Sequence, residues 1–153
     1  MFMWMIVLVM LVFPAASILI ELHGVRTAEG IFHLTGKWFV FWGVGIRILT
    51  AGLRQAIQPQ FTAKDIFGIT DQRPLLVVRE LGFANISIGI LGTCSLFDGA
   101  WLYPAAITGG LFYGLAASQH LLNKERNSLE NLVTASDLFM FVVLLIFVAK
   151  TMF

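Results

Sequence analysis

The chain has 153 residues, of which 58% are hydrophobic and only 12% are charged, and its mean hydropathy is +0.85. Soluble domains carry about 25% charged residues, so the composition excludes a water-soluble globular domain, and the 13% of aromatic residues excludes a disordered chain. The formal net charge of +1 offers no basic surface, so no nucleic-acid partner is expected. The composition therefore indicates an integral membrane protein.

Five segments have the length and apolar character of a transmembrane helix, which needs about 20 predominantly apolar residues. They cover about residues 2–22, 37–57, 75–97, 101–122 and 131–152. A segment in lipid has to satisfy its own backbone hydrogen bonds, so all of them should be helices. The expected fold class is all-α: residues 1–153 form a single transmembrane domain, a polytopic bundle of about five spans, with four as the alternative.

Three local signals refine this plan. Pro14 should kink the first span because it lacks a backbone N–H. The first span should also be retained, since a signal peptide needs a basic region at its start and Met1 to Met10 contain no Lys or Arg. Residues 62–67, between the second and third spans, have the pattern of a capped short helix at the membrane interface, with an irregular loop as the alternative.

The distribution of Lys and Arg predicts the orientation, because cytoplasmic connections are enriched in these residues. With five spans, the side of the N-terminus collects Arg54, Lys64, Arg73, Arg79, Lys124 and Arg126. The opposite side collects Arg26, Lys37 and Lys150. The sequence therefore predicts a multipass protein of the inner cell membrane with a cytoplasmic N-terminus.

Several polar residues fall inside the apolar segments. An ionisable group at the centre of a span costs about 2.5–3.5 kcal/mol, so it usually faces a partner or water. The expected topology places all of them in the cytoplasmic half: Arg47, Glu80, Asn85, His120 and Asp137. We expect a polar cluster in which Arg47 faces a carboxylate, either Asp137 or Glu80. Such a cluster either fastens helices together or binds a ligand, proton or ion.

Small residues form stripes on two of the helices. The third span carries Gly82, Gly89 and Gly92, and the fourth carries Ala106, Gly110 and Gly114. Helices in lipid associate by close backbone approach at small residues. The Asp98-Gly99 turn joins these two spans, so the two stripes should pack against each other, with a homo-oligomer contact as the alternative.

The sequence predicts no catalytic residue and no metal site. Cys94 is the only cysteine, and no close Cys/His ligand group is present. Haem would need two facing histidines, but His23 and His33 should lie on the outer side and His120 on the inner side. His120 should cap the last turn of its helix at the surface, with a proton relay to Asp137 as the alternative.

Parts of the chain resemble a known family. They are the run from Arg79 to Gly92, the run from Gly110 to Ala116 together with His120, and the stretch from Arg126 to Phe139. They resemble a family of small, uncharacterised prokaryotic multipass membrane proteins, and this resemblance covers the chain from about Gly36 and implies no known activity.

A looser likeness is to DoxX-like membrane proteins. It lies in Arg47 followed by Gly52 and in Glu80 at the start of the third span. This likeness implies a four-helix bundle and a quinone as the one cofactor to consider. The chain departs from that group in its additional N-terminal span and in its single cysteine, which cannot form an internal dithiol.

Three functional hypotheses follow. The first is a non-enzymatic membrane protein, either an accessory subunit in a homo-oligomer or larger membrane complex, or a protein that binds a small ligand or lipid at the polar cluster. The second is a quinone-linked oxidoreductase subunit in which Arg47 or His120 bonds a quinone oxygen. The third is a small ion or solute transporter, in which an Arg–Asp pair gates or binds the ion.

Overall fold

The computed structural model describes residues 2–66, 68, 71, 74–123 and 126–152. Helices make up 90% of the structure, and this described part contains no strand. The all-α fold class is thus confirmed.

The chain runs through long helices joined by short connections. The first helix consists of α1 (Phe2–Val7), η1 (Leu8–Val12) and α2 (Phe13–Glu21), and the turn η2 (Leu22–Gly24) follows. The second consists of α3 (Ala28–Phe39), η3 (Val40–Ile48) and α4 (Leu49–Ile57). After η4 (Phe61–Ile66) come α5 (Leu75–Cys94), η5 (Gly99–Trp101), α6 (Leu102–Leu122) and α7 (Ser128–Met152).

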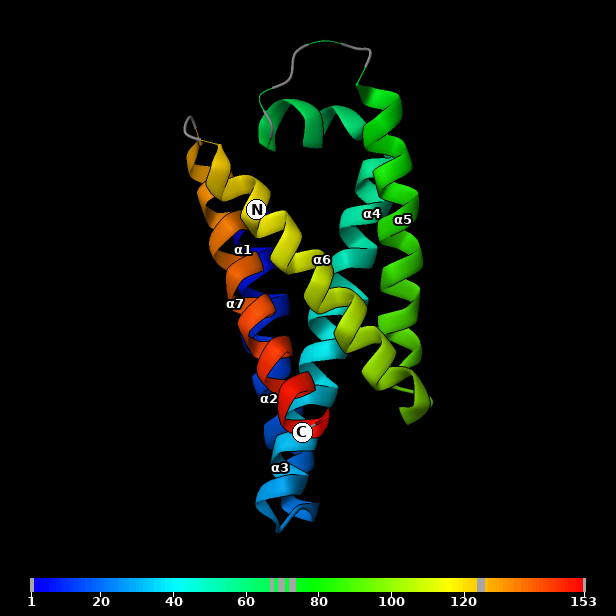
Figure 1. The fold of residues 1–153 in the computed structure, drawn as a ribbon, viewed down its shortest axis with the longest axis vertical. Coiled ribbons are helices and arrows are strands. Elements are labelled where there is room, and N and C mark those ends of the chain that lie inside the picture. The colour runs from blue at the N-terminus through cyan, green and yellow to red at the C-terminus, as the bar shows by residue number, and fades with distance from the viewer. Residues whose placement is uncertain (1, 67, 69–70, 72–73, 124–125, 153) are drawn as a thin grey trace.

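The long helices alternate in direction (Figure 1). The start of α1, the end of α4, the start of α5, the end of α6 and the start of α7 lie at one end of the molecule, called here the N-terminal end, and the C-terminus lies at the other. The short helix η4 crosses the N-terminal end, where a short helix was expected at residues 62–67. Of the residues used in that expectation and in the charge count, Phe67, Arg73 and Lys124 lie outside the described residues.

Among the described residues, three helices are both long and apolar enough to cross a membrane: Trp4–Gly24, Leu75–Cys94 and Ser128–Met152. This is fewer than the five expected. The second and fourth predicted spans are helical as well, but they carry more polar or small residues, such as Arg47 and Arg54 in one and Gln119 and His120 in the other. The second helix also begins earlier than expected, because Thr27 caps it by accepting a hydrogen bond from the Gly30 N–H at 3.1 Å.

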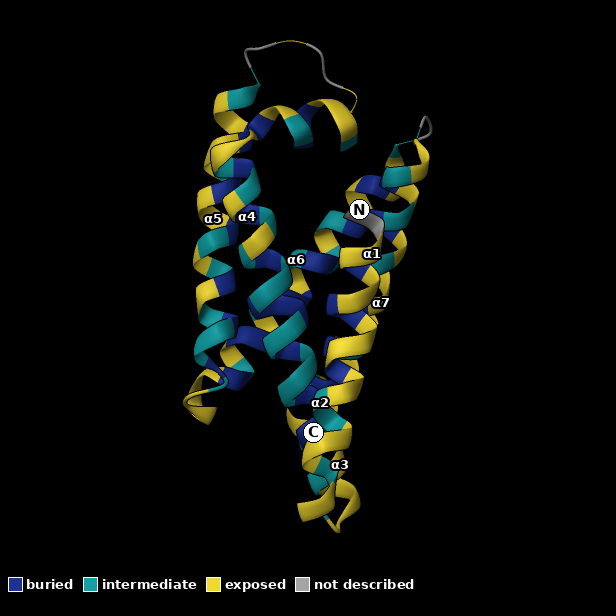
Figure 2. Ribbon diagram, turned by 180° about the vertical axis from the view of Figure 1, so that it is seen from behind, coloured by how far each residue is buried: buried dark blue, intermediate teal, exposed yellow. Residues whose placement is uncertain are grey.

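The first helix is fastened to the second near the opposite end. Lys37 Nζ lies 2.8 Å from Glu21 Oε1, and Trp38 Nε1 donates to Glu21 Oε2 at 2.9 Å. Further along, Trp42 Nε1 donates to Ser17 Oγ at 3.0 Å. Buried residues gather where α6 crosses its neighbours, whereas exposed residues cover much of the outward surface of α7 (Figure 2).

The glycine stripe of α5 does not meet α6 as expected; it meets the second helix. A Cβ on Gly92 would lie 2.4 Å from the Gly45 nitrogen, and one on Gly82 would lie 2.7 Å from the Ala56 nitrogen. Gly89 packs in the same way on Leu49. The stripe of α6 instead faces α7, where a Cβ on Gly114 would lie 2.8 Å from the Phe141 ring. Both stripes therefore serve helix packing within the chain, each with a different helix from the one expected.

Two stretches of wider, π-helical winding interrupt the first two long helices. η1 precedes Pro14, whose missing N–H removes a backbone bond at the place where a kink was expected. η3 contains Arg47, and π-helical turns are frequent at functional sites. Within η3, the Gly43 carbonyl accepts a hydrogen bond from the hydroxyl of Tyr113 on α6. This hydrogen bond thus joins η3 of the second helix to α6.

Candidate functional site

A cavity of about 350 Å³ lies in the N-terminal half of the bundle. Its walls come from α1, η1, η3, α4, η4, α5, α6 and α7. Four of the five candidate residues line it: Arg47, Asn85, His120 and Asp137. Most of the remaining wall is apolar and includes Ile48, Leu115 and Ala116. The helices thus bring polar residues from distant parts of the sequence to one partly open cavity.

Arg47 forms an ion pair with Asp137 across the cavity. Arg47 Nη2 lies 2.9 Å from Asp137 Oδ1 and donates to Ser136 Oγ at 2.8 Å. The side chains of Arg47 and Asp137 are only 13% and 5% exposed. The guanidinium carbon also lies 5.1 Å from the centre of the Tyr113 ring, in a cation–π contact. Both of these hydrogen bonds use Nη2, and the Tyr113 side chain is a further hydrogen-bonding neighbour of the guanidinium.

Asn85 has a buried side-chain acceptor that lacks a partner among the described residues. Its side chain is 2% exposed, and its Nδ2 donates to Gln55 Oε1 at 2.7 Å. Its Oδ1 is buried and has no hydrogen-bond partner among the described residues. An unsatisfied buried polar group costs about 1–3 kcal/mol. Asn85 lies where α5 packs on the second helix, since a Cβ on Gly52 would lie 2.9 Å from Asn85 Cβ.

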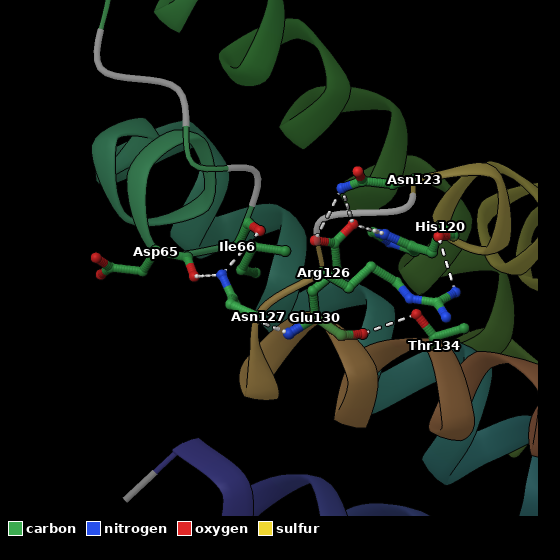
Figure 3. Close-up of polar contacts among 8 residues, drawn as sticks. All are labelled: Asp65, Ile66, His120, Asn123, Arg126, Asn127, Glu130 and Thr134. Carbon is green, nitrogen blue, oxygen red and sulfur yellow. Dashed lines mark hydrogen bonds and ion pairs between the residues drawn. The ribbon is translucent and has the colours of Figure 1, made fainter.

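The surroundings of His120 differ from the expectation. It is buried rather than a surface cap, and its Nδ1 lies 3.0 Å from Glu130 Oε1 (Figure 3). Asn123 Nδ2 donates to both Glu130 oxygens, at 3.0 and 3.1 Å. Arg126 Nη1 donates to the His120 carbonyl at 3.1 Å. His120 therefore lines the cavity, and its ring Nδ1 is paired with the Glu130 carboxylate.

A tether joins η4 to the start of α7. Asn127 Nδ2 donates to the Asp65 carbonyl at 3.2 Å, and Asn127 Oδ1 accepts from the Glu130 N–H at 2.8 Å (Figure 3). The same side chain therefore caps α7 and holds η4. Because Thr62 and Ile66 of η4 line the cavity, this tether fixes part of the cavity wall.

Glu80 is the candidate residue that does not join the others. It is exposed on α5 and is not among the described residues that line the cavity. The sequence left open whether Arg47 faces Asp137 or Glu80, and the structure selects Asp137.

Sequence reasoning missed four contributors: Gln55, Tyr113, Glu130 and Ser136. Glu130 lies on the same helical face as Asp137, at a spacing of seven residues, and that signal could have identified it. Gln55 could have been identified because it is a polar residue near the end of a predicted apolar span, directly after Arg54.

The comparisons with known proteins assign a family. The model of a family described as "Family of unknown function (DUF6790)" matches residues 1–152. The chain belongs to the DUF6790 family. The match includes the N-terminal helix, which lies before the region of resemblance noted in the sequence. No curated protein and no solved structure matches the chain. The DUF6790 match supports an uncharacterised family, and it gives no support to a likeness to DoxX-like proteins.

Proposed function

We propose that this chain is a five-span protein of the inner cell membrane that binds a small amphiphilic ligand, a lipid or lipid-like molecule, in the cavity beside Arg47. The orientation with a cytoplasmic N-terminus is supported by Arg54, Lys64, Arg79 and Arg126, which belong to the elements and connections of the N-terminal end.

The single observation that carries this proposal is the position of Arg47, a guanidinium that is paired with Asp137 and lines a cavity with mainly apolar walls. Ligand sites are typically concave and apolar, with a few polar groups that fix orientation. The cavity also has exposed apolar side chains at its rim, Met5 and Leu115, which suit entry from the acyl chains of a membrane.

The test is native mass spectrometry of the protein purified from cell membranes, with lipid extraction of the same sample. We expect a small amphiphile to copurify with the wild-type chain. Ala116→Trp should abolish this by filling the cavity, whereas Ala84→Phe, at an exposed position of α5, should retain the ligand. Equal occupancy in both variants would overturn the proposal.

A quinone-linked subunit is the second candidate function, because the cavity touches both Arg47 and His120, either of which can bond a quinone oxygen. The same lipid extracts distinguish it. A quinone absorption spectrum that is lost in Ala116→Trp would favour this candidate, and an extract without quinone would exclude it. An accessory role in a larger complex would instead appear as a second polypeptide in the native mass spectrum.

A further inference from the structure

We infer that the ligand of this cavity is an amphiphile with a singly charged anionic head group, a carboxylate or a phosphodiester, which lies beside Arg54 at the N-terminal end of the cavity. This inference rests on the proposed function and names the chemical class of its ligand. Fatty acids and acidic phospholipids are the two classes of lipid that carry such a head group.

The residues that line the cavity carry an excess of positive charge. Two of them are arginines, Arg47 and Arg54, and Asp137 is the one acid among the described lining residues. Asp137 Oδ1 lies 2.9 Å from Arg47 Nη2, so this pair contributes no net charge. Two arginines and one aspartate leave a formal charge of +1 on the lining. A head group with a single negative charge balances that excess, whereas a cationic head group would add to it.

Glu130, the acid behind His120, has partners of its own. His120 Nδ1 lies 3.0 Å from Glu130 Oε1, and Asn123 Nδ2 donates to both oxygens of the carboxylate. Arg126 donates to the His120 carbonyl at 3.1 Å, and its positive charge also acts on Glu130. Glu130 is 3% exposed and is not among the described residues that line the cavity. Its charge is therefore matched behind the cavity wall, and the excess on the lining is unchanged.

Polar lining residues gather at the N-terminal end of the cavity. Arg54 lies three residues before the end of α4 at Ile57, and Gln119 lies three residues before the end of α6 at Leu122. At about 1.5 Å per residue, each lies about 4–5 Å from the end of its helix. Thr62 belongs to η4, which crosses this end of the molecule (Figure 1). In the proposed orientation, this is the level at which lipid head groups lie.

Apolar residues line the deeper part of the cavity. Ile48 and Leu115 lie nine and seven residues from the same two helix ends, which corresponds to about 13 and 10 Å. Leu115 is 72% exposed, so an alkyl chain can pass from the cavity into the membrane at this depth. An amphiphile with its head group at Arg54 and its chain along Ile48 and Leu115 therefore meets a polar wall and an apolar wall in the right order.

An aromatic ring orients the Arg54 side chain. The guanidinium carbon of Arg54 lies 3.4 Å from the centre of the ring of Phe61, the first residue of η4. A guanidinium that stacks on a ring keeps its charge, and its N–H groups point outward in the plane of the guanidinium. Carboxylate and phosphate oxygens bind guanidinium groups in that plane. The contact with Phe61 thus positions the cation at the junction of α4 and η4 for an anionic head group.

The experiment compares four probes that share one oleyl chain, added to the full-length protein in detergent. Oleate carries a carboxylate, oleoyl lysophosphatidylglycerol a phosphodiester, monooleoylglycerol no charge and oleyltrimethylammonium a cation. Dissociation constants are measured by native mass spectrometry and by competition at pH 9, where both anions are ionised. We expect one or both anions to bind at least about tenfold more tightly than monooleoylglycerol, as one charge-assisted hydrogen bond would produce. The tighter anion then distinguishes a fatty acid from an acidic phospholipid, and the cation should bind most weakly.

Arg54→Gln isolates the role of the excess charge. The variant should bind monooleoylglycerol as tightly as the wild type does, which also reports that the cavity is intact, while the preference for the anions falls towards one. Arg54→Lys keeps the charge and should retain part of the preference. Arg79→Gln is the matched control, since Arg79 is an exposed cation near the start of α5 that is not among the described lining residues. This control should keep the preference in full.

Three results would overturn the inference. They are binding of monooleoylglycerol or of the cation as tight as that of both anions, a preference that survives in Arg54→Gln, and an equal loss of preference in Arg79→Gln. Should Arg54→Gln not fold, the order of the four probes on the wild type and on Arg79→Gln decides the matter.

The two proposals can fail separately. Binding of any probe that Ala116→Trp abolishes and Ala84→Phe preserves supports the cavity as a ligand site, whatever the head-group preference. A preference for monooleoylglycerol with this pattern would refute only the anionic head group. An absence of binding by all four probes, or binding that is unchanged in Ala116→Trp, would refute both. Acetate and glycerophosphoglycerol, which carry the two anionic groups without a chain, should not compete; competition as strong as that of the lipids would also refute both.

Discussion

Arg47 and Asp137 are 90 residues apart in the sequence, yet Arg47 Nη2 lies 2.9 Å from Asp137 Oδ1. This contact joins the π-helical part of the second helix to α7 at the wall of the cavity. This buried ion pair connects two helices, and both of its residues also line the cavity. The consequences for stability and for binding can be tested separately.

The first prediction concerns this ion pair. Arg47→Met leaves the Asp137 carboxylate buried without its counter-ion, which should cost about 3–5 kcal/mol of unfolding free energy. Adding Asp137→Leu should recover most of that loss, because no uncompensated charge remains. The measurement is thermal unfolding in detergent. Lys37→Met is the control, since its partner Glu21 is 42% exposed and such pairs contribute at most about 1 kcal/mol. Additive losses in the double variant would contradict the prediction.

The second prediction concerns the contact between α5 and the second helix. Gly92→Ala should destabilise the protein strongly, by more than the roughly 1–3 kcal/mol typical of overpacking, because the new Cβ would lie 2.4 Å from backbone at Gly45. Gly110→Ala is the matched control on α6, since its Cβ would lie 3.5 Å from Leu144 Cβ, an ordinary contact. The unfolding temperatures of the two variants provide the comparison. Similar values for both would mean that α5 does not pack on Gly45 in this way.

The third prediction concerns the hydroxyl that holds η3. Tyr113→Phe keeps the ring but removes the donor to the Gly43 carbonyl, and it should cost about 0.5–1.5 kcal/mol. Tyr103→Phe is the control: the Tyr103 ring stacks on Phe147 at an interplanar angle of 8°, and this stacking does not need the hydroxyl. Denaturant unfolding followed by tryptophan fluorescence measures both. A greater loss from Tyr103→Phe would argue against a role for the Tyr113 hydroxyl.

The fourth prediction concerns the tether between η4 and α7. Asn127→Asp retains an acceptor that can cap α7 but lacks the Nδ2 donor to the Asp65 carbonyl. Hydrogen exchange should therefore accelerate in residues 61–66 while the start of α7 stays protected. In Asn127→Ala, both regions should exchange faster, since cap and tether are lost together. Unchanged exchange of residues 61–66 in Asn127→Asp would show that another contact holds η4.

Part of this arrangement could be predicted from the sequence. Ionisable and amide groups are conspicuous in apolar segments, and on that signal the sequence selects Arg47, Glu80, Asn85, His120 and Asp137 as a group, of which Glu80 lies exposed on α5 and apart from the other four. The helical fold followed from composition for a related reason, since apolar segments of this length in lipid have to be helical. The structure places these four residues at one cavity, while their part in binding a ligand remains a proposal.

The remaining features depend on relations between helices. Periodicity tells which residues share a face, but not which helix that face meets, and so the expected neighbour of the α5 glycines was wrong. The partner of His120 depends on how the connection around Asn123 returns the chain to Glu130, which periodicity does not encode. The expected number of membrane-crossing helices exceeds the three found among the described residues, because the small and polar residues that α6 buries make it less apolar than its length suggests.

The close approach of α5 to the second helix has a mechanical consequence. Backbone meets backbone at Gly45 and Gly92 and again at Gly52 and Gly82, with no side chains between them that could adjust. Such a contact has no slack, so these two helices should move as one rigid body. Any change in the volume of the neighbouring cavity would then fall on α1, α6 and α7, whose contacts at the cavity are made by side chains such as Met5, Phe112 and Val133.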